Sequence, residues 1–279
     1  PSLVGVTVHE MSHSWFQAVV ATNEALYEWM DEGFTSWIET ECMDVIAPRE
    51  MSKNKVGGAH TYSYSGYINQ ALSANEEALS THADHYTTNR AYGIAAYAKG
   101  EVLVEQLGAI IGEETRNIGM KKYFKDWSFK HPGPTDFKRV MERTSGIELD
   151  WYFDYFVNTI HTIDYSIKSV ATEKNESTIT LEKIGVMPMP QDLMVTFKDG
   201  TSTLYHIPLV IMRGNRKMND GERLATDWPW TNPTYSINIP TLGKRIASIT
   251  LDPLLLQADV NRENNTVEFK SIGKQNFNR

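Results

Sequence analysis

The chain has 279 residues, of which 41% are hydrophobic and 22% charged, a size and composition typical of a globular protein with a sizeable core. Its formal net charge of −8 argues against nucleic acid or an anionic membrane surface as a partner. No apolar run approaches the roughly 20 residues that span a bilayer. The single cysteine, Cys42, excludes an intrachain disulfide and leaves the compartment open.

The first predicted elements are two helices separated by a short turn. Turn-spaced residues predict a first helix from about residue 6 to residue 20, with one face formed by Val6, His9, Glu10, His13, Phe16 and Gln17. Thr22 or Asn23 can cap a second helix, and Glu24 favours its first turn. We expect the second helix to return antiparallel to the first.

Further helices are predicted over residues 97–112 and 115–129. Another begins near Pro134, where Thr135 is a candidate cap, and stops at Gly146. Residues 149–157 predict a short aromatic helix.

From about Asp164 the hydrophobic period changes to two, which is typical of half-buried strands. Strands are expected within 177–181, 193–197, 204–212, 235–239 and 246–251. Asp199 and Gly200 predict a hairpin turn after the second of them. We therefore predict a multidomain α + β chain, with a helical region at residues 1–162 and a β-sandwich at residues 163–279.

The first helix carries an H-E-x-x-H motif, His9-Glu10-Met11-Ser12-His13. Positions i and i+4 share one face of a helix, so His9 and His13 can reach a single zinc ion at about 2.0–2.1 Å. Glu10 is rotated by roughly 100° from His9 and can stand beside the metal as a general base. The pattern predicts a catalytic zinc site with Glu10 as a catalytic residue.

A catalytic zinc needs a third protein ligand and one open position. Glu32 is the candidate, because an antiparallel second helix returns it to the level of His13. Gly33, next to it, lowers helix propensity and suggests close packing or a special backbone. The alternative is that His9 and His13 are ordinary helix histidines, since a bare H-E-x-x-H also arises by chance.

A second cluster, His82-Ala83-Asp84-His85, could also bind a metal ion, but its polar surroundings favour a solvated loop.

Three segments resemble the M1 aminopeptidases, a family of gluzincins with a thermolysin-like catalytic domain. They are residues 9–16 (HEMSHSWF), residues 29–34 (WMDEGF) and residues 97–100 (YAKG). Weaker similarity continues through the aromatic helix into the β-rich region. The resemblance implies one zinc ion per chain, held by His9, His13 and Glu32, and a helical catalytic portion followed by an all-β sandwich domain.

The resemblance also implies that Tyr97 stabilises the tetrahedral oxyanion, with Tyr92 as the fallback candidate. Three departures are visible. The residues after Phe16 are Gln17-Ala18, where the family more commonly has Gly-Asn. Asp31 stands where the family usually has Asn, which we expect to affect substrate preference more than the metal site. The family's G-x-M-E-N signature, whose Glu binds the substrate's free amino group, is absent from this sequence.

The predicted function is zinc-dependent peptide hydrolysis, with aminopeptidase activity implied by the resemblance. The expected partner is a peptide substrate, with no nucleic acid and no membrane span; the chain looks cut from a longer protein whose upstream β-domain and amine-binding segment it lacks. The alternatives are an endopeptidase or other zinc hydrolase on the same scaffold, and a non-catalytic zinc or peptide-binding module. The resemblance alone favours a periplasmic or secreted location.

Overall fold

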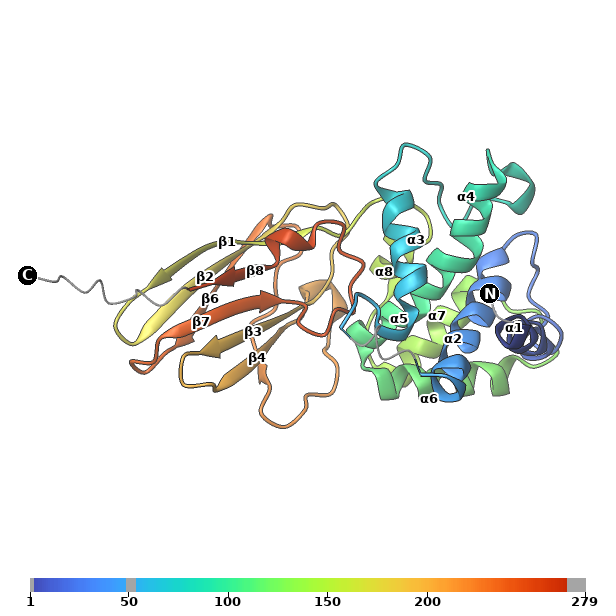
Figure 1. Cartoon of the computed structure of the whole chain (residues 1–279). Coiled ribbons are helices and arrows are strands. Elements are labelled where there is room, and N and C mark those ends of the chain that lie inside the picture. Colours follow the sequence, from blue (N-terminus) through green and yellow to red (C-terminus); the bar gives the residue numbers. More distant parts are fainter. Residues whose placement is uncertain (1–2, 49–53, 270–279) are drawn as a thin grey trace, which may run out of the picture.

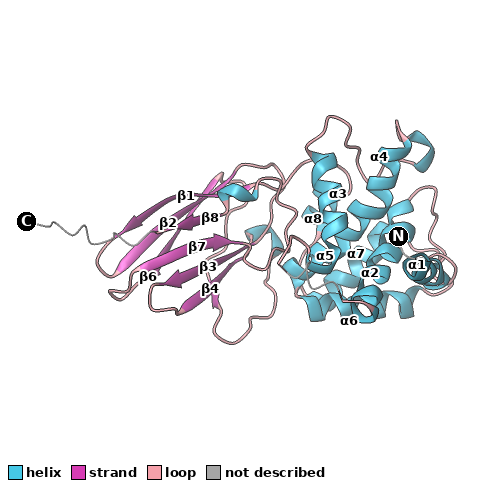
Figure 2. Cartoon of the chain, in the orientation of Figure 1, coloured by secondary structure: helices cyan, strands magenta, loops and turns pink. Residues whose placement is uncertain are grey.

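The structure is a computed structural model that describes residues 3–48 and 54–269. Helices fill the chain up to Phe156 and strands begin at Tyr165 (Figure 2). The helices are α1 (Leu3–Phe16), α2 (Phe34–Ile46), α3 (Thr61–Ala71), α4 (Asn89–Gly93), α5 (Gly100–Ile111), α6 (Glu113–Trp127), α7 (Pro134–Ser145) and α8 (Asp150–Phe156). Within the described ranges, none of them is long and apolar enough to cross a membrane.

Helix α1 is shorter than predicted, because residues 17–20 form a turn instead of a further helical turn. The turn-spaced residues named in the sequence analysis differ in burial. Val6 and Glu10 are exposed, whereas the fully buried positions are Gly5, Ser12 and Phe16. His9 and His13 are half-buried at the edge of this face, where they remain accessible to a ligand.

The second predicted helix starts differently from the expectation. Asn23 does cap a turn, since its Oδ1 accepts hydrogen bonds from the backbone N–H of Ala25 at 3.1 Å and of Leu26 at 3.3 Å. The chain then enters a π-helical segment, Trp29–Gly33, which leads directly into α2. Inserted π turns are frequent at functional sites.

A second π-helical segment, Ile94–Lys99, lies between α4 and α5. The first π-helical segment packs closely against the second and against the start of α5, where Gly33 meets Gly100, the first residue of α5. A Cβ added to Gly33 would lie 2.6 Å from the Cα of Gly100, so side chains are excluded at this crossing. The close packing suggested by the sequence at Gly33 is confirmed.

Later in the helical region, the predicted boundaries of α7 are confirmed, but the predicted cap Thr135 is wrong. The N-cap is Gly133, whose backbone N–H donates to Oδ2 of Asp136 at 3.0 Å. The helix begins at Pro134 and ends before Gly146, whose φ of 72° is the left-handed C-terminal stop that glycine permits.

The strands form two sheets that share a core. Their bounds are β1 (Tyr165–Thr172), β2 (Glu176–Lys183), β3 (Gln191–Phe197), β4 (Ser202–Ile207), β5 (Arg223–Leu224), β6 (Thr234–Pro240), β7 (Ile246–Leu251) and β8 (Thr266–Glu268). One sheet has the order β1-β2-β6 and the other β5-β4-β3-β7-β8. All named pairs are antiparallel except β4 with β5.

Two details of the sheets bear on the sequence predictions. The predicted turn at Asp199 and Gly200 joins β3 to β4, with Gly200 at a φ of 85°. The predicted strand 204–212 was too long. It ends at Ile207, because Pro208 has no N–H for the ladder, and residues 210–212 form a 3₁₀ turn.

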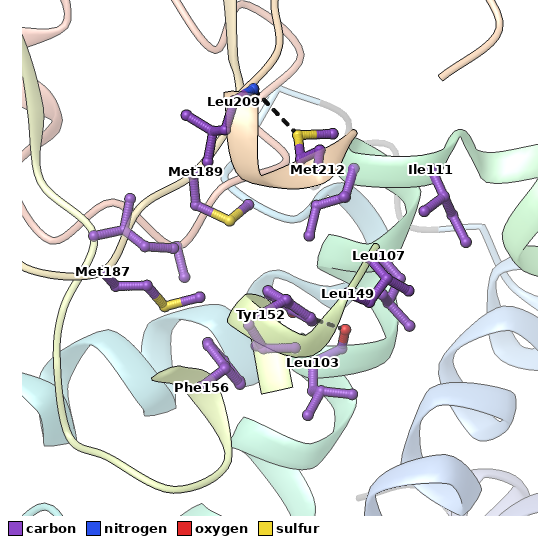
Figure 3. Close-up of a cluster of buried hydrophobic side chains, with 14 of the residues drawn as sticks. Leu103, Leu107, Ile111, Leu149, Tyr152, Phe156, Met187, Met189, Leu209 and Met212 are labelled. Atoms are coloured by element: carbon purple, nitrogen blue, oxygen red, sulfur yellow. Dashed lines mark hydrogen bonds between the residues drawn. The ribbon is translucent and has the colours of Figure 1, made fainter. Parts of the chain in front are cut away.

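The strand-rich part lies against the helical part through a buried apolar cluster (Figures 1 and 3). It joins side chains of α5, α8 and two sheet connections, labelled in Figure 3 as Leu103, Leu107, Ile111, Leu149, Tyr152, Phe156, Met187, Met189, Leu209 and Met212. The Tyr152 hydroxyl donates a hydrogen bond to the carbonyl of Leu103 at 2.9 Å. Burial of each apolar side chain of this kind contributes about 1.5–3 kcal/mol to the free energy of folding. The cluster therefore fixes the position of α5, which lies behind the candidate site.

Candidate metal centre

Three side chains that the sequence singled out meet at one point between α1 and the first π-helical segment. The Nε2 atoms of His9 and His13 are 3.2 Å apart. The Oε2 of Glu32 lies 3.2 Å from the former and 3.3 Å from the latter. Bonds of about 2.0–2.1 Å at tetrahedral angles put zinc ligands about 3.3 Å apart, so this donor set fits zinc.

Both histidines are oriented by a carboxylate on the other ring nitrogen. His13 Nδ1 lies 2.6 Å from Oδ1 of Asp31, and His9 Nδ1 lies 3.1 Å from Oε2 of Glu39. Such contacts fix the tautomer that presents Nε2 to a metal. Asp31 therefore contacts a candidate ligand, which the expectation about substrate preference did not include.

Glu39 was missed by the sequence analysis. It follows Glu32 by two helical turns and therefore lies on the same face, a spacing from which it could have been found.

Hydrogen bonds and burial shift the pKa values of several groups at this site in opposite directions. Hydrogen bonds to Glu32 and then Glu39 raise the pKa of His9 to about 9, against the lowering effect of burial. Burial raises the pKa of Glu32, but hydrogen bonds from His9 and Tyr97 outweigh it, so the net pKa is lowered. Burial raises the pKa of Asp31 to about 6, opposed by the charge of His13.

Tyr97 lies beside the three donors, on the second π-helical segment. Its ring stacks on His9 with centroids 5.9 Å apart, and its hydroxyl hydrogen-bonds to Glu32. Burial, and then this hydrogen bond, raise the pKa of Tyr97, which keeps it a donor near neutral pH. Tyr92 lines a neighbouring pocket and contacts Tyr86 with ring centroids 5.6 Å apart. Glu10 is exposed on α1 directly after His9.

A second group of histidine and carboxylates surrounds the buried His60. Its Nδ1 lies 2.7 Å from Glu101, and its Nε2 lies 3.0 Å from Glu41 and 3.3 Å from Glu105. Burial lowers the pKa of His60, but Glu101 and Glu41 outweigh this and raise it to about 10. Because Glu105 is also paired with Arg116, the group is a satisfied ion-pair network.

The segment 82–85 behaves as a local turn. His82 Nδ1 accepts a hydrogen bond from the backbone N–H of Asp84 at 3.1 Å, and the Asp84 side chain is 89% exposed.

Two histidines one turn apart on α1, with a carboxylate from the next helical element, form the ligand arrangement of a gluzincin peptidase. The model of the peptidase family M1 domain matches residues 2–156. The chain belongs to peptidase family M1.

Individual relatives match a little over half of this chain. Leucine aminopeptidase 2 of Lodderomyces elongisporus is 23% identical over 177 residues, 56% of this chain and 26% of that protein. Aminopeptidase N of Streptomyces lividans is 27% identical over 163 residues, 54% of this chain and 18% of that protein. The chain thus spans about a quarter or less of the length of these relatives.

A solved structure extends the similarity into the sheets. The crystal structure of Legionella pneumophila aminopeptidase A superposes with a TM-score of 0.60 and 13% identity, covering 91% of this chain and 26% of that one. This likeness supports the α + β fold, with a helical part followed by a β domain.

Proposed function

We propose that the chain carries the hydrolytic centre of a zinc aminopeptidase, with His9, His13 and Glu32 as the ligands of one zinc ion. One observation carries the proposal: three donor atoms from two elements lie 3.2–3.3 Å apart, the spacing of ligands around a tetrahedral zinc ion. Membership of peptidase family M1 supports the same reading.

The chemistry divides among a few side chains. Zinc, when bound, lowers the pKa of its water and polarises the scissile carbonyl. Glu10 accepts the proton of the attacking water and passes it to the leaving amine. Tyr97 donates a hydrogen bond to the developing oxyanion. Its hydroxyl lies beside the candidate zinc ligand Glu32, and therefore close to where the reacting carbonyl would bind. Asp31 and Glu39 hold the two imidazoles in the ligating tautomer.

We further propose that the chain consists of two domains with different roles, and that another part of the protein contributes to substrate recognition. Residues 1–162 form the catalytic region and residues 163–279 a β-sandwich domain that braces α5 and α8. Because the chain covers only 26% and 18% of two relatives, we place recognition of the substrate's free amino group on a segment outside these 279 residues.

The test compares a fluorogenic leucyl amide with its N-acetylated counterpart, using the zinc-loaded longer protein that includes the proposed amine-binding segment. We expect hydrolysis of the free amine alone. In Glu10→Gln the rate should fall by about a hundred- to ten-thousandfold while zinc is retained. Full activity in that variant, or no hydrolysis by the zinc-loaded longer protein, would contradict the proposal. Equal hydrolysis of the acetylated substrate would favour the endopeptidase alternative.

A further inference from the structure

Lys99 is a buried lysine two residues after Tyr97, at the end of the second π-helical segment. It is only 2% exposed, and its Nζ donates a hydrogen bond at 2.7 Å to Oε1 of Glu76, whose side chain is 4% exposed. A second hydrogen bond runs from Nζ to the carbonyl of Thr159 at 3.3 Å. Neither member of this ion pair has a part in the chemistry proposed for the zinc site.

Stability alone does not account for the buried ion pair. Burial lowers the pKa of Lys99 and raises the pKa of Glu76, and the attraction between the two groups opposes both shifts only in part. Both groups are therefore shifted toward their neutral forms, so the pairing does not fully offset the loss of hydration. Such a pair can still select one arrangement of the segments that it joins.

The segment that carries Tyr97 has few other side chains that could fix its orientation. Its six residues, Ile94–Lys99, include three buried alanines. A methyl group makes few packing contacts, so alanines define the rotation of a helical segment only weakly. Lys99 is the one long side chain among the buried residues of this segment.

Lys99 and Tyr97 lie on different faces of the segment, because positions i and i+2 of a helix do not face each other. The Tyr97 hydroxyl bonds to Glu32 at the candidate metal centre. The Lys99 Nζ lies over the rings of Tyr67 on α3 and Phe156 on α8, at 5.3 and 5.4 Å from their centroids. Phe156 belongs to the buried cluster of Figure 3. A rotation that moved the Tyr97 hydroxyl would therefore have to break the contacts of Lys99 with the core.

We propose that Lys99 is a positioning residue, whose ion pair with Glu76 fixes the rotation of the second π-helical segment and so holds the Tyr97 hydroxyl where the oxyanion forms. The inference rests on the proposed function, because it takes from it the role of Tyr97. Misplacing a catalytic group by about 1 Å can lower the rate about a hundredfold, so a small rotation of the segment is enough to matter.

The test removes both charges together, because Lys99→Met alone would leave the buried carboxylate of Glu76 without its cation. The variant combines Lys99→Met with Glu76→Gln in the zinc-loaded longer protein. The matched control combines Lys122→Met with Asp126→Asn, which removes an exposed ion pair on α6. Hydrolysis of the leucyl amide gives kcat and KM, and zinc content and amide hydrogen exchange are measured for each variant.

We expect kcat of the Lys99–Glu76 variant to fall about ten- to hundredfold, with KM changed less than about twofold and zinc content unchanged. In a Tyr97→Phe background the same two substitutions should lower kcat by less than about twofold, because the hydroxyl that they misplace is gone. Amides of residues 94–100 should exchange at least about tenfold faster. The control pair should change none of these quantities.

An unchanged kcat would overturn the proposal. So would an equal loss of kcat with and without the Tyr97 hydroxyl, since the pair would then act on the fold in general. If the double variant does not fold, Glu76→Asp takes its place, because it keeps both charges and shortens the acceptor. It should lower kcat at least about threefold, again only when the Tyr97 hydroxyl is present, and an unchanged kcat would again refute the role of Lys99.

Failure of the proposed function gives a different result, because the wild-type longer protein would then hydrolyse nothing. Hydrogen exchange decides the role of Lys99 in that case. Unchanged exchange of residues 94–100 in the Lys99–Glu76 variant would overturn it, and faster exchange confined to these residues would support it.

Discussion

The packing of the two π-helical segments determines how Glu32 on the first and Tyr97 on the second face each other. The substitution Gly33→Ala tests whether this close packing is required. The new Cβ would lie 2.6 and 2.8 Å from the Cα and carbonyl carbon of Gly100 and 3.0 Å from the carbonyl oxygen of Ala96. All three contacts are with backbone, so no side chain can rotate away. Overpacking costs about 1–3 kcal/mol, and more when backbone must shift, which outweighs the gain of up to about 1 kcal/mol in helix propensity.

Gly93→Ala is the matched control, because Gly93 is also helical and nothing lies within 4 Å of its added Cβ. Urea denaturation should show Gly33→Ala destabilised by at least about 1 kcal/mol, and Gly93→Ala stabilised by about 0.5–1 kcal/mol. Zinc affinity, measured against a chelating dye, should fall about 10- to 100-fold only in Gly33→Ala, because the segment carrying Glu32 is displaced. If both variants match the wild type in stability and zinc affinity, the reasoning about the crossing is wrong.

The remaining predictions concern the residues around the site. Asp31→Ala should weaken zinc binding about 10- to 100-fold, because His13 loses its orienting acceptor, whereas Asp31→Asn should retain most of the affinity. Competition with a chelating dye measures the zinc affinity of both variants. Equal zinc affinities of the two variants would contradict the role of Asp31. Zinc must displace the proton of His9, whose pKa is about 9 without zinc, so zinc affinity should rise by about tenfold per pH unit between about pH 6.5 and 9. Calorimetry in several buffers should detect the released proton. Zinc binding without proton release would refute this prediction. His60→Gln leaves Glu101 without its cation and should cost about 3–5 kcal/mol in urea denaturation, whereas the exposed His161→Gln should change stability by less than about 0.5 kcal/mol. Because folding raises the pKa of His60, its contribution is fully present below its unfolded value of about 6.5. That contribution is lost as the pH rises through about 10, and a wild-type stability independent of pH in this window would contradict it.

The features that sequence predicted best were those set by local spacing. The i and i+4 positions of His9 and His13 fix them on one helix face, and a helical return of plausible length suffices to bring Glu32 beside them. The stop of α7 at Gly146 is likewise local, since it depends on one residue with a positive φ.

The features that sequence missed depend on contacts between distant segments. The π-helical segments were not predicted, because no sequence periodicity separates them from ordinary helix. The contact between Gly33 and Gly100 likewise joins segments that are far apart in the sequence. The ion pair between Lys99 and Glu76 joins residues 23 positions apart, so no local spacing indicates it. Asp31 was noticed as a departure from the family, but its contact with His13 required coordinates.

The most direct test of the central claim is X-ray absorption spectroscopy of the zinc-loaded chain, combined with its metal content. The account predicts one zinc per chain, with two imidazole nitrogens and a carboxylate oxygen at about 2.0–2.2 Å, and loss of the metal in His9→Ala. A zinc environment without imidazole, or a His9→Ala variant that still binds one zinc with unchanged affinity, would contradict it.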